Sequence, residues 1–283
     1  MKTLLIVSAA LGAVALAACG NGAVAFSAHD DDASVSIKDA VARVNVIVED
    51  RADVAVEVSN AAGLPALQVR KLGDRIEVDG DLRRRIQNCE SGGVSVRGHG
   101  QVAFANAPVI TIRSPRKVSV NAGGAVSGQI GAGATDISLG SAGCGDWTVA
   151  DASGAMSLSL AGSGDIKAGA SRSLSANLAG SGDIRTGATR TLSANIAGSG
   201  DIEVARVDGP VDANIAGSGD IKVLAGEATK VDANIMGSGD VEFAGRAGSA
   251  DANVMGSGNV RIAQVSGAID RHVAGSGRVI VGQ

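Results

Sequence analysis

Leu-Ser-Ala-Asn-Leu-Ala-Gly-Ser-Gly-Asp-Ile, residues 174–184, is the stretch of this sequence that decides the fold. Its central phrase, Gly-Ser-Gly-Asp, begins at Gly162, Gly180, Gly198, Gly217 and Gly237. Variants of the phrase begin at Gly143, Gly256 and Gly275, so successive starts lie 18 to 20 residues apart. A period close to 19 residues predicts a repeat architecture in which each unit forms one layer of a stack.

Each repeat contains two strand-like runs. In the first run, Leu174, Ala176 and Leu178 fall on one face of a strand, while Ser175 and Asn177 fall on the other. The second run begins with Ile or Val at one equivalent place: Ile166, Ile184, Ile202, Ile221, Val241, Val260 and Val279. We expect these side chains to stack inward, about 4.8 Å apart, along a parallel sheet. Helices are excluded because a glycine pair in every repeat would break them.

The Gly-Ser-Gly phrase predicts a sharp corner between the two runs. Glycine adopts positive φ without the penalty of a Cβ atom, and two glycines also let neighbouring layers approach closely. The Ser and Asp side chains are predicted to hydrogen-bond to the amides freed at the turn. These structural roles explain the motif without a ligand.

The composition favours thin stacked layers and excludes several classes of protein. Hydrophobic residues make up 45% of the chain and aromatic residues 1%, so Val, Ile, Leu and Ala must build the core. Four prolines beside 41 glycines exclude collagen and proline-rich disorder. With a net charge of −4 and almost no stacking side chains, no nucleic acid is expected as a partner.

The first 18 residues are predicted to be an export signal. Lys2 precedes an apolar run, residues 4–18, that is too short to span a bilayer. The run ends Leu16-Ala17-Ala18-Cys19, which resembles a bacterial lipobox, so we expect lipidation of Cys19 and anchoring to a membrane through that lipid. Ordinary secretion is the alternative, because Ala15-Leu16-Ala17 also fits a signal-peptidase site.

Beyond the signal, three parts are predicted. Residues 19–36 are expected to be a tether, residues 37–120 irregular β-strand layers that cap one end, and residues 121–283 the regular repeat. Within the middle part, residues 83–100 show little alternation and are predicted to form a loop.

A family resemblance rests on the order of these features. An export signal, short β-strands, the run Val109-Ile110-Thr111-Ile112-Arg113 and the Gly-Ser-Gly-Asp-Ile repeats resemble the "putative auto-transporter adhesin head GIN domain" family, a bacterial domain of unknown function. The similarity covers roughly residues 37–275. The resemblance implies an all-β, right-handed parallel β-helix (β-solenoid) on the cell envelope. It brings no catalytic residues and no cofactor.

Two cysteines remain besides Cys19, namely Cys89 and Cys144. In an oxidising compartment such a pair favours a disulfide, which would close a loop of about 55 residues and stabilise the fold by about 4 kcal/mol in the loop-entropy model. Two separate thiols are the alternative.

The stacked aspartates are the candidate metal site. Repulsion between layers would be relieved by calcium at Asp165, Asp183, Asp201, Asp220 and Asp240. Alternatively, the neighbouring bases Lys167, Arg185 and Lys222 relieve it. The spacing differs from that of the calcium-binding nonapeptide repeat, so no metal ion is assigned.

Three further features have structural and functional interpretations. Stacked amides that bond along the layers explain the row at Ser159, Asn177, Asn195, Asn214, Asn234, Asn253 and His272. Trp147 replaces the stacked Ile or Val in one repeat and is expected to fill the core, with an exposed contact as the alternative. The cluster Arg83-Arg84-Arg85 is expected in a solvated loop, or else on an acidic envelope polymer.

The function favoured by the sequence is a non-enzymatic, envelope-anchored β-solenoid whose long polar surface serves adhesion or interaction with an envelope polymer or protein. We expect an exported, outer-membrane-anchored lipoprotein; a soluble periplasmic or secreted protein is the alternative. One alternative function is a polysaccharide-active enzyme on a β-helix scaffold. The other is a structural periplasmic lipoprotein with no dedicated ligand.

Overall fold

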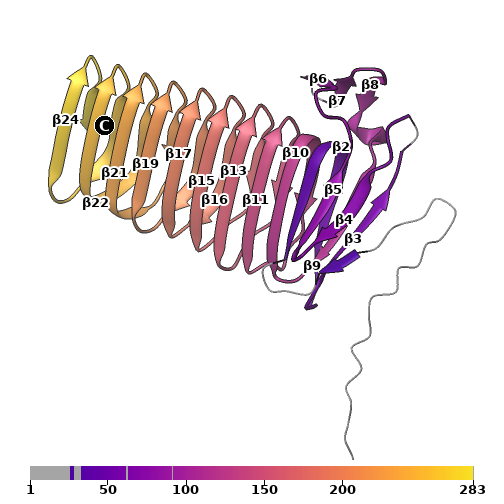
Figure 1. The fold of residues 1–283 in the computed structure, drawn as a ribbon. Helices are drawn as coiled ribbons and strands as arrows, with labels where there is room; N and C mark the ends of the chain where they lie inside the picture. Colours follow the sequence, from indigo (N-terminus) through magenta and orange to yellow (C-terminus); the bar gives the residue numbers. More distant parts are fainter. Residues whose placement is uncertain (1–25, 29–32, 62, 91, 283) are drawn as a thin grey trace, which may run out of the picture.

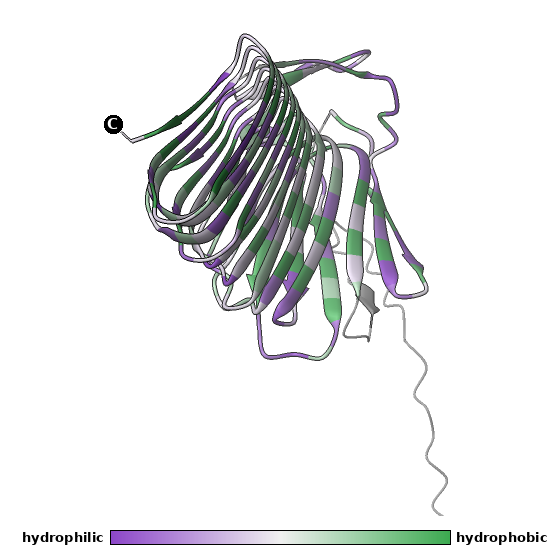
Figure 2. Ribbon diagram, turned by 90° about the vertical axis from the view of Figure 1, so that its left-hand side faces the viewer, coloured by the Kyte–Doolittle hydropathy of each residue, from purple (hydrophilic) through white to green (hydrophobic). Residues whose placement is uncertain are grey.

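The computed structural model describes residues 26–28, 33–61, 63–90 and 92–282. They form a β-solenoid, in which short strands from successive repeats lie side by side and stack into one long body (Figure 1). Seen from its C-terminal end, the body shows coils of nearly the same shape, stacked one behind another (Figure 2). The parallel solenoid predicted from the repeat is therefore confirmed. The predicted signal, residues 1–18, and Cys19 lie outside the described residues.

Each regular coil contributes one long strand and one shorter strand. The long strands pair in parallel along one side, which we call the Asn face: β10 (Lys117–Ile130), β11 (Asp136–Gly143), β13 (Ala155–Gly162), β15 (Ser173–Gly180), β17 (Thr191–Gly198), β19 (Val211–Gly217), β21 (Glu227–Gly237), β22 (Val241–Gly256) and β24 (Ile269–Gly275). The second side consists of β12 (Trp147–Val149), β14 (Ile166–Ala168), β16 (Ile184–Thr189), β18 (Ile202–Val207), β20 (Ile221–Val223), β23 (Asn259–Val265) and β25 (Arg278–Val281), together with parts of β10 and β22.

The register places the predicted rows of side chains in line. Ile184 pairs with Ile202, and Ile202 pairs with Ile221, in a row that is fully buried. On the Asn face, Leu174 and Leu178 point into the same core. Trp147 holds the Ile position in its coil and is 1% exposed, so it fills the core as expected. The space it needs comes partly from the coil before, where a Cβ on Gly128 would lie 2.6 Å from the indole ring.

Each residue of the corner motif has a role in stacking. At Gly198 the backbone has φ +150°, and a Cβ there would collide with the carbonyl oxygen of Gly180 in the coil before. That oxygen accepts the N–H of Ser199 at 2.9 Å and the N–H of Gly200 at 3.2 Å. The close approach predicted for the glycines is confirmed. Ser199 contributes its backbone, whereas its side chain, which we expected to bond to the turn, makes no hydrogen bond to the described residues.

The N-terminal end of the stack is closed by strands of mixed direction. β2 (Ser34–Val48) is a full coil, since it pairs in parallel with β10 along both sides. β5 (Arg75–Asp79) and β9 (Val109–Ser114) complete the next layer. Beyond them, β4 (Gln68–Leu72), β3 (Val54–Ser59) and β1 (Phe26–Ala28) pair antiparallel. The predicted cap is confirmed, because antiparallel strands end the parallel repeat.

A small lobe stands on the upper rim at this end (Figure 1). It contains a separate antiparallel sheet of β6 (Ile86–Glu90), β7 (Gly93–Val96) and β8 (Gly100–Ala103), followed by the 3-10 turn η1 (Phe104–Asn106). Its own core includes Val94 and Val96. The loop predicted for residues 83–100 is therefore wrong. A bulge in β6 and glycines with positive φ interrupt the alternation from which strands are recognised.

The predicted boundaries also shift. The tether predicted for residues 19–36 includes β1 and the start of β2, whose core-facing Val35 is buried. The boundary predicted between residues 120 and 121 falls inside β10, so the regular stack begins earlier than the glycine phrases suggest. None of the described segments is a helix with the length and apolarity needed to cross a bilayer.

Candidate functional site

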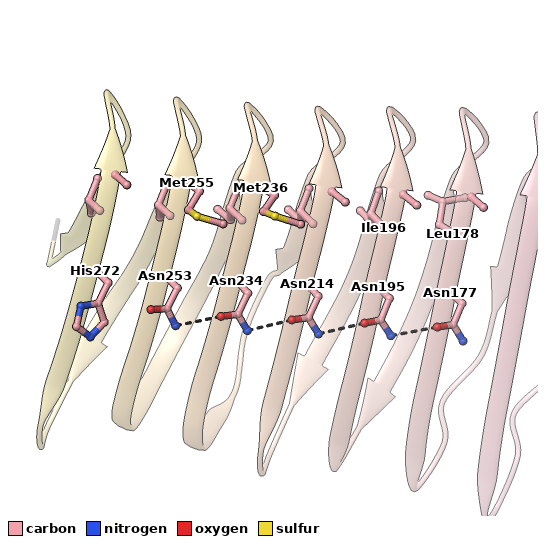
Figure 3. Close-up of a pocket in the computed structure, with 18 of the residues that line it drawn as sticks. Asn177, Leu178, Asn195, Ile196, Asn214, Asn234, Met236, Asn253, Met255 and His272 are labelled. Atoms are coloured by element: carbon pink, nitrogen blue, oxygen red, sulfur yellow. Dashed lines mark hydrogen bonds between the residues drawn. The ribbon is translucent and has the colours of Figure 1, made fainter.

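A long groove runs along the Asn face, across the coils from β13 to β24. It has a volume of about 1210 Å³. The Asn face carries three outward rows of side chains, each contributed once per coil, and the two rows that line the groove are drawn in Figure 3. The groove follows directly from the repeat, because residues two apart on a strand share a face and identical positions align between coils.

The middle row is a ladder of asparagine amides. Asn195 donates from Nδ2 to Oδ1 of Asn177 at 3.0 Å, and the same bond, also at 3.0 Å, repeats through Asn214, Asn234 and Asn253 (Figure 3). The predicted amide ladder is thus confirmed over these coils. His272 aligns with Asn253 in the last described coil, but no hydrogen bond joins the two side chains.

The row nearest the corner is apolar and open to solvent. It contains small residues in most coils and two methionines, in the order Ala161, Ala179, Ala197, Ala216, Met236, Met255 and Ala274. The Met236 and Met255 side chains lie in the groove with exposures of 57% and 56%. We had not singled out this row, although its outward place could have been found by comparing residues at one position of the repeat.

The third row becomes acidic toward the C-terminus. Ser193 aligns with Asp212, which is followed by Asp232, Asp251 and Asp270 in the next coils. Lys230 lies beside this row and bonds to Asp232 at 2.6 Å. That hydrogen bond, with the charges of Asp232, Asp251 and Asp270, raises the pKa of Lys230 above its usual value. One end of the Asn face is therefore negative.

The calcium candidates lie at the corners, outside the groove. The Asp183 carboxylate accepts the backbone N–H of Asp201 at 3.0 Å, and the Asp201 carboxylate accepts that of Asp220 at 2.9 Å. In the same way, the Asp165 carboxylate accepts the backbone N–H of Asp183, and the Asp220 carboxylate accepts that of Asp240. The expectation that these carboxylates bond to turn amides is confirmed. The bond runs between coils, so each acid holds the next coil in register.

Basic side chains partner two of these acids. Arg185 contacts Asp183 at 2.9 Å, and Lys222 contacts Asp220 at 3.1 Å. The hydrogen bond that Lys222 donates to Asp220 raises the pKa of Lys222, and the charges of Asp201 and Glu242 act in the same direction. Among the described residues, no group of three or more His, Cys, Asp or Glu side chains has an arrangement that could hold a metal ion.

The remaining candidates lie in or beside the lobe. Cys89 on β6 and Cys144 beyond β11 are joined as a disulfide, with Cα atoms 6.1 Å apart. It ties the lobe to a corner of the solenoid. Arg83, Arg84 and Arg85 form an exposed turn at the base of the lobe, far along the chain from the groove. His99 bonds through Nδ1 to the carbonyl oxygen of Gly63 at 2.7 Å.

A comparison with protein families places this surface in context. The family described as "Putative auto-transporter adhesin, head GIN domain" matches residues 42–226 and 209–282. The chain belongs to this family. The resemblance seen in the repeats is thereby confirmed. No curated protein matches the chain significantly.

Several solved structures resemble this chain at low sequence identity. A putative adhesin from Bacteroides fragilis NCTC 9343 is 16% identical, with 93% of this chain and 98% of that chain covered and a TM-score of 0.41. A putative lipid binding protein from Parabacteroides distasonis ATCC 8503 is 20% identical, with 93% and 98% covered and a TM-score of 0.47. A putative adhesin from the same Parabacteroides strain is 16% identical, with 92% and 97% covered and a TM-score of 0.38.

Proposed function

We propose that this protein is a non-enzymatic adhesion module of the bacterial cell envelope and that the Asn face is its contact surface. The observation that carries the proposal is the groove itself. Its asparagine side chains offer amide oxygens as hydrogen-bond acceptors along the ladder, and its open methionines offer apolar area that a partner would bury. Membership of an adhesin-like family supports the same function.

The described histidines are not arranged for general acid–base catalysis. His99 bonds to a backbone carbonyl, and His272 has no hydrogen-bond partner among the described side chains. General acid–base catalysis by histidine uses a ring that a second group orients toward the reacting atoms, and neither ring bonds to a carboxylate.

The rigid ladder explains how such a surface would bind. Each amide is already held by its neighbours, so little side-chain freedom is lost when a partner docks, whereas flexible side chains would lose entropy. Because an amide oxygen recurs at the same place in successive coils, an elongated partner with repeated polar groups could contact several coils at once. Simultaneous weak contacts raise the overall affinity.

A binding array tests the proposed surface. The purified protein is applied to immobilised envelope polysaccharides and extracellular matrix proteins, beside the double variant Met236→Asp, Met255→Asp. We expect the wild type to bind at least one surface and the double variant to lose about tenfold or more in affinity, because buried apolar contacts become charged.

Leu224 offers a matched control for the array. It is 51% exposed, similar to the two methionines, but it lies outside the groove. The variant Leu224→Asp should bind as the wild type does. Binding to no immobilised surface, or equal losses in the groove and control variants, would contradict the proposed contact surface.

We further propose that a lipid on Cys19 anchors the protein in the envelope, because the sequence before Cys19 resembles a lipobox. Mass spectrometry of the mature N-terminus should find an acylated cysteine as the first residue. The variant Cys19→Ser should leave the membrane fraction, since two or three acyl chains give stable anchoring. A mature N-terminus that carries no lipid and begins at a residue other than Cys19 would overturn this part of the proposal.

A further inference from the structure

A concentration of positive charge lies at the base of the lobe, on an otherwise acidic protein. Residues 82–103 contain four arginines and one acidic residue, so this segment carries +3. The rest of the chain carries −7, because the net charge of the whole is −4. Such a local reversal of charge draws anionic partners to one place, while the remaining surface repels them.

The backbone brings the four arginines together. The N–H of Arg85 donates to the carbonyl oxygen of Leu82 at 2.9 Å, which closes the turn that carries Arg83 and Arg84. The N–H of Arg97, at the end of β7, donates to the carbonyl oxygen of Arg85 at 2.8 Å. All four side chains are exposed. They therefore form one patch, which we call the Arg patch: Arg83, Arg84, Arg85 and Arg97.

The backbone of the Arg patch is held in place, whereas its guanidinium groups have no partner within the described residues. Leu82 is 2% exposed in the lobe core, and its N–H bonds to the carbonyl oxygen of Asp39 at 2.9 Å. By contrast, none of the four guanidinium groups has a hydrogen bond or an ion pair within the described residues. The nearby Asp79 carboxylate accepts the backbone N–H of Asp81 instead. Within the described residues, the donors of the patch therefore remain available to a partner.

From this geometry we infer that the Arg patch is a second contact surface, which binds an anionic polysaccharide. Guanidinium groups bind sulfate, phosphate and carboxylate groups through paired hydrogen bonds, and a chain that carries many such groups can engage several arginines together. This binding is independent of the Asn face, which is acidic in its C-terminal half and belongs to other coils.

A polysaccharide fits the patch better than a lipid surface or a nucleic acid does. The large exposed hydrophobic residues of the described chain lie elsewhere, at Leu72, Leu224, Met236, Met255 and Val273, so the lobe offers none to insert into a bilayer. The lobe also lacks a row of open rings on which bases could stack, because Phe104 is half-buried against the lobe core and the His99 ring is bonded to the carbonyl oxygen of Gly63. The patch provides charge and planar hydrogen-bond donors, which is what an anionic sugar polymer requires.

The test uses dextran sulfate as the anionic polysaccharide and neutral dextran as its uncharged counterpart. Binding of the purified protein is measured at low salt by interferometry, and the wild type should bind dextran sulfate only. The triple variant Arg83→Gln, Arg85→Gln, Arg97→Gln should lose about tenfold or more in affinity. Raising the salt concentration should weaken wild-type binding, because ions screen exposed charges.

A second triple variant removes the same charge from the solenoid: Arg172→Gln, Arg190→Gln, Arg261→Gln. These arginines are also exposed, and this variant should change the affinity by less than about twofold. Circular dichroism should show that both triple variants stay folded. The groove variant Met236→Asp, Met255→Asp should still bind dextran sulfate, which separates this test from that of the Asn face.

Three outcomes would overturn the inference. The first is the absence of wild-type binding to dextran sulfate. The second is an equal loss in the two triple variants, which would show that net charge alone drives binding. The third is tighter binding to vesicles of phosphatidylglycerol and phosphatidylcholine than to dextran sulfate, which would assign the patch to a lipid surface.

Discussion

The two glycines of each corner set how closely neighbouring coils approach, since a Cβ on either Gly198 or Gly200 would collide with a carbonyl oxygen of the coil before. Gly198 has φ +150°, a backbone conformation that favours glycine, and the carbonyl oxygen of Gly180 lies where its Cβ would be. The serine that follows contributes only its backbone N–H to the stack. Two adjacent residues of the motif thus differ sharply in how much their side-chain identity matters.

Gly198→Ala should destabilise the solenoid severely. Backbone strain alone costs about 1–3 kcal/mol, and the contact with the Gly180 carbonyl adds to it. Thermal and urea unfolding of the variant would measure the loss. Ser199→Ala is the matched control and should change the free energy of unfolding by less than about 0.5 kcal/mol. Equal stability of the two variants would show that the corner tolerates a Cβ atom.

The corner aspartates should not need calcium. One oxygen of Asp201 is occupied by the N–H of Asp220, and Arg185 and Lys222 partner the acids on either side. We therefore expect millimolar calcium or a chelator to leave the melting temperature unchanged within about 1 °C, since only a ligand that binds the folded state raises it. A calcium-dependent rise that Asp201→Asn abolishes would instead assign a calcium site to this row.

The lobe is the element whose stability depends most on a covalent link. Its core is small, and only a few residues of β2 and β10, including Val41 and Ala125, contribute to it from the solenoid. Small sheets bury too little apolar area to be stable alone, so a cross-link contributes a large share of their stability.

Cys89 and Cys144 should resist thiol reagents until the protein is reduced. Peptide mass spectrometry after labelling would show this directly. Replacing both with serine should lower the free energy of unfolding of the lobe by up to about 4 kcal/mol, as expected for a closed loop of 55 residues. Hydrogen exchange should then rise in β6–β8 while β15 and β17 stay protected. Labelling of both cysteines before reduction would refute the link.

As a whole, the solenoid has two unlike ends. Antiparallel strands close the N-terminal end, whereas β24 and β25 have no strand beyond them among the described residues. In β24 the core-facing row that holds Ala233 and Ala252 continues with Arg271, which is exposed. A charge in the inward row of the last described coil discourages another sheet edge from pairing there.

Arg271→Leu should make the protein associate end to end. The variant removes the charge that protects the open edge, so light scattering should show larger species that grow with concentration. Arg261→Leu changes an outward arginine one coil earlier and should remain as monodisperse as the wild type. If both variants stay equally monodisperse, Arg271 does not guard the edge.

How far sequence predicts this fold depends on whether the information is local. The coils, the inward row through Ile184 and the ladder through Asn195 repeat every 18 to 20 residues, so one repeat predicts them all. The lobe was missed because its strands are short, bulged and interrupted by glycine, and their core comes partly from β2 and β10. The predicted tether, residues 19–36, is too long because β1 and the start of β2 form strands by pairing with distant segments.

For the candidate surfaces too, the sequence predicts some features and the tertiary structure is needed for the others. The amide ladder could be predicted from a row of asparagines, but the groove required the side chains of many coils to be placed together. The Arg patch likewise needed tertiary structure, because Arg97 joins the arginine turn through β-pairing and the absence of partners appears only in three dimensions. Periodic sequence determined the repeated coil by local geometry. Contacts between distant segments decided the cap, the lobe and which side chains remain available to a partner.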